Sequence, residues 1–211
     1  MLPLLSLLET RALGVLIEKE RTVPDTYPLT LNALLSGCNQ KTSRDPVLSA
    51  AETEVQSALD SLKRMSLVIE SSGGRVARYS HNAERVLHLP AQACSLLAVL
   101  MLRGPQTVGE IKGRTERIYA FADLDETETV LQKMMDRAEG ALVQRLPHAP
   151  GTKEPRYAQT LGGEVEVAAP VVVSAPVHGG MGERVAALEG EVSRLREEVN
   201  ELRRRLDEVL N

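Results

Sequence analysis

Apolar positions over residues 1–88 recur in the order of three helices followed by a two-stranded hairpin. Ser6 and Glu9 have the spacing of a capping box, in which each side chain binds a free amide at the start of a helix, and Ser49 and Glu52 repeat that spacing before an apolar helical face. This order is typical of a winged helix, a helix-turn-helix unit with a β-hairpin wing. The predicted elements are helices over about 6–19, 29–39 and 49–65 and strands over 67–69 and 75–80.

The same order of elements returns over residues 89–166. An apolar helix ends at Gly104-Pro105, Thr107 and Glu110 form a third capping box, and a further helix precedes a second hairpin. Similar residues stand at nearly constant spacing in the two halves, which indicates a duplicated unit. The spacing is 77 residues from Thr30 to Thr107, 78 from Arg78-Tyr79 to Arg156-Tyr157 and 75 from Leu67-Val68 to Leu142-Val143. We therefore expect a mainly α fold with small β-wings, of the α+β class, in which two tandem winged-helix domains span 1–88 and 89–166.

Beyond the second domain the pattern changes twice. Residues 167–182 are rich in Val, Ala, Pro and Gly and carry no charge, which is typical of an extended linker. Residues 183–211 show the alternating spacing of a coiled coil, and β-branched residues alternating with Leu favour two parallel strands, hence a homodimer. A helix that folds back on its own domains is the alternative. The predicted dimer seam consists of Val185, Leu188, Val192, Leu195, Val199, Leu202, Leu206 and Val209.

Composition narrows the classes of function. The 211 residues include one Phe, four Tyr and no Trp, too few rings for the stacking surfaces of single-strand or RNA readers. The net charge of −4 argues against a general polyanion binder. Cys38 and Cys94 have neither disulfide-framework nor metal-site spacing, and the apolar start lacks the layout of a signal peptide. With no apolar stretch long enough for a membrane span, we expect a cytoplasmic protein.

No pattern in the sequence predicts catalysis. The four His residues are scattered, and none has metal-ligand spacing with another His or Cys. Residues 104–109 resemble half of a P-loop, but Glu110 and Ile111 stand where Lys and Ser or Thr would bind phosphate and metal. We therefore expect a protein that is not an enzyme, with no catalytic residue, no cofactor and no metal ligand.

DNA binding is the use that a winged helix suggests first, because its third helix enters the major groove while the wing holds phosphates. The second domain is the poorer candidate, since Asp125, Glu126 and Glu128 crowd the start of its third helix and repel phosphate. These features favour a homodimeric DNA-binding regulator. The alternative is a protein-interaction or architectural adaptor that docks proteins with its winged helices. The candidate DNA-binding residues are Lys41, Arg44, Gln56, Lys63, Arg64, Arg75 and Arg78.

Four long segments carry a family resemblance: EKERTVPDTYPLTLNALLSGCNQKTSRDPV (18–47), EVQSALDSL (54–62), GRTERIYAFADL (113–124) and LPHAPGTKEPRY (146–157). They resemble the YceH-like bacterial proteins, a family without an assigned function. The resemblance covers about residues 8–161 and implies a tandem winged-helix fold, in agreement with the duplicated pattern. It implies no activity and no established catalytic or binding residue.

Overall fold

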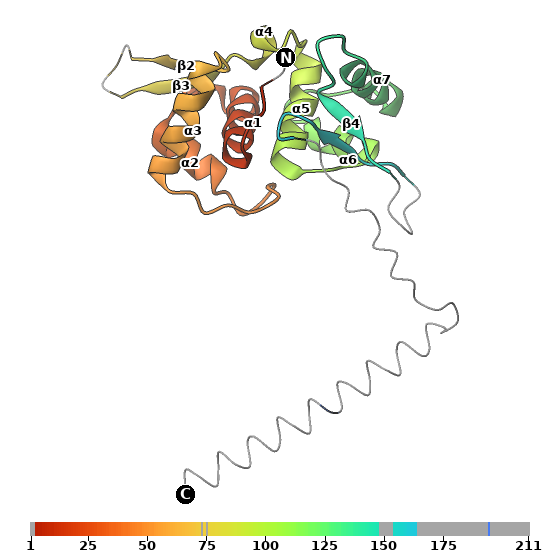
Figure 1. The fold of residues 1–211 in the computed structure, drawn as a ribbon, viewed down its shortest axis with the longest axis horizontal. Helices are drawn as coiled ribbons and strands as arrows, with labels where there is room; N and C mark the ends of the chain where they lie inside the picture. The colour runs from red at the N-terminus through yellow and green to blue at the C-terminus, as the bar shows by residue number, and fades with distance from the viewer. Residues whose placement is uncertain (1–2, 73, 75, 148–153, 164–193, 195–211) are drawn as a thin grey trace, which may run out of the picture. The chain divides into compact units, whose positions relative to one another are not determined.

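The structure is a computed structural model of the full chain, and it describes residues 3–72, 74, 76–147, 154–163 and 194. The chain divides into two compact units, Met1–Ala168 and Ala169–Asn211. Apart from Arg194, the predicted linker and coiled-coil helix lie outside the described residues, as does every residue of the predicted dimer seam, so these stay predictions. The first unit is mainly helical with small antiparallel sheets (Figure 1).

The elements of the first repeat follow the predicted order, with additions. They are α1 (Leu7–Thr22), the 3-10 turn η1 (Pro24–Thr26), β1 (Leu29–Thr30), α2 (Leu31–Cys38), α3 (Glu52–Arg64), β2 (Val68–Ser71), β3 (Arg78–His81) and α4 (Ala83–Val86). The capping box before α1 is confirmed, because the Ser6 hydroxyl accepts a hydrogen bond from the Glu9 amide while the Glu9 carboxylate accepts one from the Ser6 amide. The strands form one antiparallel sheet in the order β1-β3-β2.

The second repeat has the same order of three helices followed by a two-stranded hairpin. Its elements are α5 (Ala91–Arg103), α6 (Val108–Thr115), α7 (Leu124–Met135), β4 (Val143–Arg145) and β5 (Tyr157–Gln159). The Thr107 and Glu110 capping box before α6 is confirmed by both of its hydrogen bonds. Asp123 caps α7 by accepting a hydrogen bond from the Glu126 amide, which is how an acidic residue stabilises a helix start.

The strand pairing repeats as well as the order. In the first repeat Leu29 pairs with Tyr79, which joins the segment before α2 to the wing. In the second repeat Gln106, in the segment before α6, forms an isolated antiparallel bridge with Tyr157. The spacings are 77 and 78 residues, the same as those found between the two halves of the sequence, so the equivalent contacts support a duplicated unit.

Two of the differences from the predicted boundaries change the type of an element or its cap. Leu29 and Thr30 were expected in a helix but form β1, and α2 starts only after Thr30, whose hydroxyl accepts from the Ala33 amide. The predicted capping box at Ser49 is wrong. Helix α3 follows Ala51, and the carboxylate of Glu54 accepts from the Ala51 amide at 2.7 Å.

The later start of α3 has a clear physical cause. The side chain of Asn39 accepts from the Ala50 amide at 2.8 Å and donates to the Ala50 carbonyl at 2.9 Å. This pair of hydrogen bonds uses the backbone groups of Ala50 outside any helix, so the chain turns helical only after Ala51.

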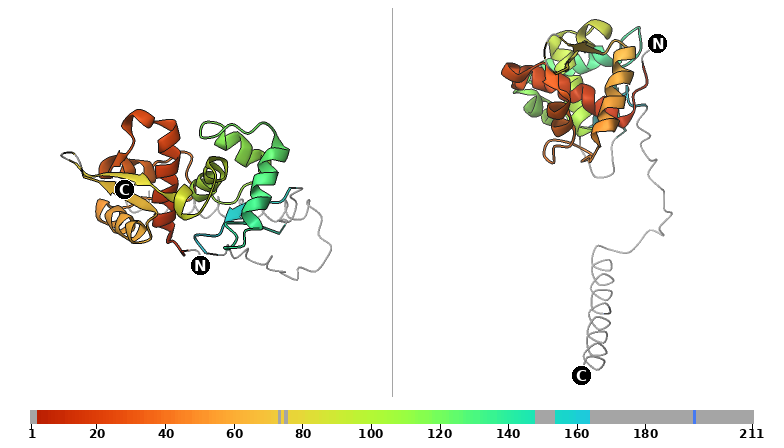
Figure 2. Two further views of the ribbon diagram at one scale, coloured as in Figure 1. Left: turned by 90° about the horizontal axis from the view of Figure 1, so that it is seen from above. Right: turned by 90° about the vertical axis from the view of Figure 1, so that its left-hand side faces the viewer.

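Helices α1 and α5 form the centre of the first unit and lie side by side, as Figure 2 also shows from above. Every residue from Thr10 to Ile17 of α1 and from Ala93 to Leu102 of α5 is buried. A Cβ added at Gly14 would lie 3.1 Å from the Leu102 side chain, so glycine permits the close approach of the two helices. The core cluster is continuous through both repeats.

Candidate nucleic-acid interface

The exposed face of α3 was predicted to enter a DNA groove. In the structure its polar side chains bind one another. Val55, Leu59 and Leu62 fix the orientation of the helix by burying its opposite face. The Gln56 amide donates to Asp60 at 3.1 Å, and Lys63 binds Asp60 at 2.8 Å.

A carboxylate from the sheet completes this network. Lys63 also binds Glu70 of β2 at 2.6 Å. Hydrogen bonds to Asp60 and Glu70 raise the pKa of Lys63, and the hydrogen bond from Lys63 is the main cause that lowers the pKa of Asp60. The Lys63 charge is therefore matched by two carboxylates and is poorly placed to attract a phosphate.

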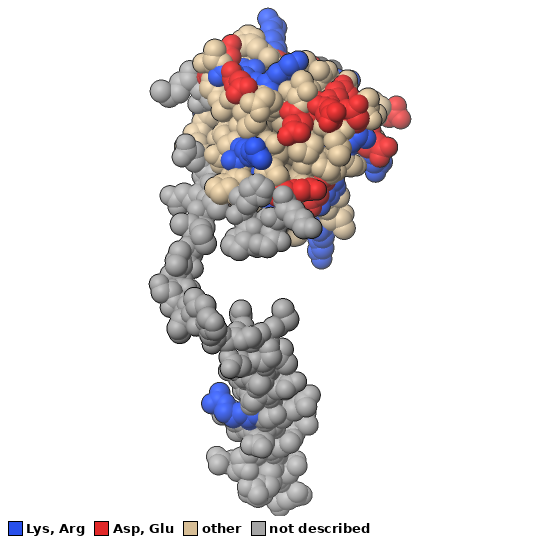
Figure 3. Space-filling view, turned by 90° about the vertical axis from the view of Figure 1, so that its right-hand side faces the viewer, with Lys and Arg blue, Asp and Glu red and all other residues tan. Residues whose placement is uncertain are grey.

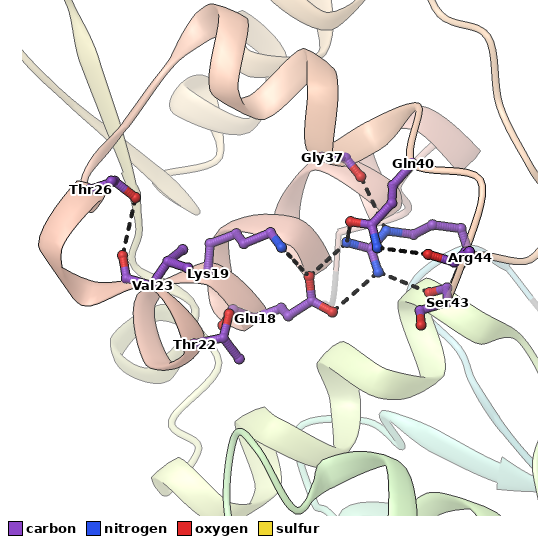
Figure 4. Close-up of polar contacts among 10 residues, drawn as sticks. Glu18, Lys19, Thr22, Val23, Thr26, Gly37, Gln40, Ser43 and Arg44 are labelled. Atoms are coloured by element: carbon purple, nitrogen blue, oxygen red, sulfur yellow. Dashed lines mark hydrogen bonds and ion pairs between the residues drawn. The ribbon is translucent and has the colours of Figure 1, made fainter.

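Arg44 is buried, so its prediction as a surface phosphate contact needs correction. Its side chain is 0% exposed and donates two hydrogen bonds to the Glu18 carboxylate of α1, at 2.6 and 3.1 Å (Figure 4). The same guanidinium donates to the carbonyls of Gly37 and Ser43. The sequence placed Arg44 in a polar loop and gave no sign of Glu18, which lies 26 residues earlier.

Arg78 is exposed, but its guanidinium is bound to backbone. It donates to the carbonyls of Thr26 and Pro28, at 3.3 and 2.8 Å. Arg156 of the second repeat makes the equivalent contact, donating to the Pro105 carbonyl at 2.9 Å. The contact ties each wing to the segment that precedes the second helix of its repeat, which gives both arginines a structural role.

Three basic residues of the candidate DNA-binding set remain to be placed. Lys41 and Arg64 are exposed and form no ion pair with any described residue. Arg75 lies outside the described residues. The structure thus leaves two of the predicted basic side chains available on this surface, and they lie at separate places in the chain, one in the loop before α3 and one at its end.

The third helix of the second repeat is acidic, as its sequence predicted. Glu128 is the fifth residue of α7, the position that Gln56 has in α3. Glu128 accepts a hydrogen bond from the Tyr157 hydroxyl of its wing, and Gln56 accepts one from the Tyr79 hydroxyl of its wing, both at 3.4 Å. Figure 3 views the molecule from the side of this repeat and shows acidic side chains gathered on part of the face. The exposed residues of α7 and its cap include Asp125, Glu128, Gln132, Lys133 and Asp136.

The described part of the chain bears on three features: a metal site, a membrane-spanning helix and a reactive thiol. Within it, no three or more His, Cys, Asp or Glu side chains are close enough together to hold a metal ion. No helix in the same residues is long and apolar enough to cross a membrane. Cys38 and Cys94 are buried free thiols, and burial raises the pKa of each to about 12, so both stay protonated and poorly nucleophilic near neutral pH.

One group of basic residues was not predicted as a site. Arg103, at the end of α5, lies in one pocket with Arg114 of α6 and with Arg156. Nothing in the sequence distinguished Arg103, because it ends an apolar helix and has no basic residue beside it. All three arginines belong to the second repeat, from α5, α6 and the residue before β5, and their convergence is visible only in three dimensions.

These features define a mainly helical protein with small antiparallel sheets. The model of a family described as "Protein of unknown function, DUF480" matches residues 5–152. A UPF0502 protein of Dechloromonas aromatica is 51% identical over 199 residues, which cover 92% of this chain and 93% of that protein. A UPF0502 protein of Methylibium petroleiphilum is 57% identical over 171 residues, 80% and 73% of the two chains. The chain belongs to this DUF480, or UPF0502, family of bacterial proteins of unknown function, which confirms the uncharacterised family that the sequence suggested.

Proposed function

We propose that this chain is a non-enzymatic adaptor that uses two winged-helix repeats to bind a protein partner. The winged-helix interpretation is supported by the order of three helices and a hairpin in each repeat, and by the pairing of the segment before the second helix with the last strand. The proposal for binding rests on one observation, the acidic groups on both third helices.

In a DNA-binding winged helix the third helix meets the phosphates at close range. Here the Lys63 charge of α3 is taken by Asp60 and Glu70, and α7 carries Glu128 where α3 carries Gln56. Each carboxylate near a phosphate costs affinity, because counterion release is the main source of binding to duplex DNA. A protein surface with basic side chains is a better match for both helices.

Homodimerisation is part of the proposal. The heptad pattern of residues 183–211 supports a parallel two-stranded coiled coil, which brings two copies of the folded unit together. Two copies provide four third helices to a partner, and linked sites bind more tightly than one when the linker lets them act together.

A DNA-binding assay on the full chain distinguishes the adaptor from a DNA-binding regulator. The adaptor predicts no shift of duplex DNA at micromolar protein near physiological salt. It also predicts that the double substitution Asp60→Asn and Glu70→Gln, which removes two acids while keeping the side-chain shapes, increases DNA affinity by freeing Lys63.

A positive test uses site-specific photo-crosslinking in cells. A photoreactive residue at Gln132 of α7 is expected to give a discrete protein adduct that Glu128→Lys abolishes, while the same residue at Asn32, an exposed position of α2, gives none. Adducts of equal yield from both positions would contradict a binding surface on α7.

A DNA-binding regulator is the second candidate, and the exposure of Lys41 and Arg64 favours it. It predicts a duplex shift that weakens steeply as salt rises and that Lys41→Ala with Arg64→Ala removes. Arg85→Ala is the matched control, since Arg85 is exposed on α4 and forms no ion pair with a described residue. That result would replace the adaptor proposal.

A further inference from the structure

A polar pocket lies where the two repeats meet in the first unit. Its volume is about 300 Å³, and seven of the eight described residues that line it are charged or polar. That volume is at the low end for ligand pockets, which measure about 300–1,000 Å³. The lining comes from the loop before α3, the end of α5 and the loop after it, α6 and the residue just before β5. The lining residues are Ser43, Arg44, Asp45, Arg103, Pro105, Glu110, Arg114 and Arg156.

Positive side chains outnumber negative ones in and around this pocket. Arg44 is matched by Glu18, while Glu110 is shared between Arg156 at 3.0 Å and Arg114 at 3.5 Å. Asp45 forms no ion pair with a described residue. Four arginines therefore face three carboxylates, and Arg103 has neither an ion pair nor a side-chain hydrogen bond with any described residue.

A further positive charge lies behind the loop that lines the pocket. Arg11 of α1 is 0% exposed, and its guanidinium donates to the carbonyls of Cys38 and Pro46 while forming no ion pair with a described residue. Burial, followed by the charge of Arg44, lowers the pKa of Arg11. Burial and the neighbouring charge of Arg114 also lower the pKa of Arg103. The arginines repel one another at this place, and an added anion relieves the repulsion.

The loop that closes the pocket is held in a specific conformation. Ser43 has a φ of 61°, a left-handed value that is strained for a residue other than glycine. Its carbonyl accepts from Arg44 at 2.9 Å, and the neighbouring Asp45 amide donates to the Leu102 carbonyl at 2.8 Å. The pocket is therefore built before any ligand arrives, and a bound ligand does not have to order the loop.

We propose that this pocket binds a phosphate group. Guanidinium groups bind phosphate through two parallel hydrogen bonds, and the surplus of positive charge suits a dianion. Arg103 provides a full guanidinium for this contact, and Arg156 has its Nε and Nη2 groups unused by described residues. Among the described residues of the lining there is no aromatic side chain to stack on a base, so the phosphate itself is the recognised group. The inference does not depend on the adaptor function.

Calorimetric titration of the full chain with inorganic phosphate tests the proposal, with sodium chloride at equal ionic strength as the blank. Arg103→Gln is expected to weaken phosphate binding by about tenfold or more, the usual loss for a charge-assisted contact. Arg85→Gln makes the same change on exposed α4 and is expected to leave the affinity unchanged. Equal melting temperatures of the two variants without phosphate show that Arg103→Gln is folded.

A second arm identifies the source of the phosphate group. A duplex oligonucleotide that competes with inorganic phosphate, and loses this ability in Arg103→Gln, shows that the pocket takes a phosphodiester of DNA. A phosphorylated sugar that competes where the duplex does not shows a small-molecule site. The proposal is overturned if the wild-type chain gives no heat with millimolar phosphate, or if Arg103→Gln and Arg85→Gln bind it equally well.

Discussion

The hydroxyl of Tyr157 lies 3.4 Å from Oε1 of Glu128 and donates a hydrogen bond to it, so the wing of the second repeat is joined to a carboxylate on its third helix. Burial raises the pKa of Tyr157, and the negative charge of Glu128 raises it further. The same contact in the first repeat joins Tyr79 to the neutral amide of Gln56. At this equivalent position the wing tyrosine therefore meets a negative charge in the second repeat and a neutral amide in the first.

Glu128→Gln should lower the pKa of Tyr157, because the substitution removes the nearby negative charge and leaves the burial. A ¹³C-tyrosine NMR titration measures this directly for each of the four tyrosines. Glu116→Gln is the control, since Glu116 is exposed and forms no ion pair with a described residue. An unchanged Tyr157 titration in Glu128→Gln would show that the carboxylate points elsewhere in solution.

Arg44→Ala should destabilise the protein by about 3–5 kcal/mol, because it leaves the Glu18 carboxylate without its buried partner. Urea denaturation measures the loss. Glu18→Gln and the double variant complete a thermodynamic cycle, in which a coupling energy of about 0.5–3 kcal/mol is expected for groups in direct contact. Lys41→Ala, in the same loop but exposed, should change stability by no more than about 0.5 kcal/mol. Equal small effects for Arg44 and Lys41 would mean that Arg44 is a surface residue.

Stability should fall at alkaline pH because of the two buried thiols. The folded-state pKa of Cys38 and of Cys94 is raised to about 12 from an ordinary value of 9.0, so the folded protein keeps two protons that the unfolded chain releases. The stabilisation is complete below pH 9 and is lost between about pH 9 and pH 12, at about 2.7 kcal/mol per pH unit for two groups. Urea denaturation in reductant, compared with Cys38→Ala/Cys94→Ala, measures the difference. Parallel pH profiles for the two proteins would contradict the prediction.

Light scattering should give twice the chain mass for the full protein and a single chain mass for residues 1–166. The expected cause is the pairing of the predicted seam, in which the Leu and Val side chains of two copies bury one another. Leu188→Lys with Leu195→Lys in the full chain should have the same effect as the truncation. A mass that does not change in either variant would show that the coiled coil does not hold the dimer.

The sequence predicted those features that depend on neighbouring residues. The capping boxes at Ser6 and Thr107 need only side chains three residues apart, and both form. The strand β1 was missed because its two residues become a strand only by pairing with β3. The box at Ser49 failed for a similar reason, since the side chain of Asn39 holds Ala50 from 11 residues away.

The candidate site was harder to predict for the same physical reason. The apolar spacing of residues 52–65 predicted which face of α3 is buried, but of the three candidate residues on the other side only Arg64 is exposed, while Gln56 and Lys63 are half-buried. Their availability depends on partners from other elements, as with Glu70 for Lys63 and Glu18 for Arg44. The sequence gives the net charge of each segment. Phosphate binding depends instead on which basic side chains are free of an ion pair with a carboxylate of the same protein.

The close packing of α1 against α5 at Gly14 limits the movement of the two repeats relative to each other. Each repeat shields the apolar side of the other from water, so neither can swing away without exposing buried side chains. The two third helices are consequently held at one separation and one angle. On the proposed function, a partner that contacts both third helices has to match their separation, because movement of one repeat against the other exposes buried side chains.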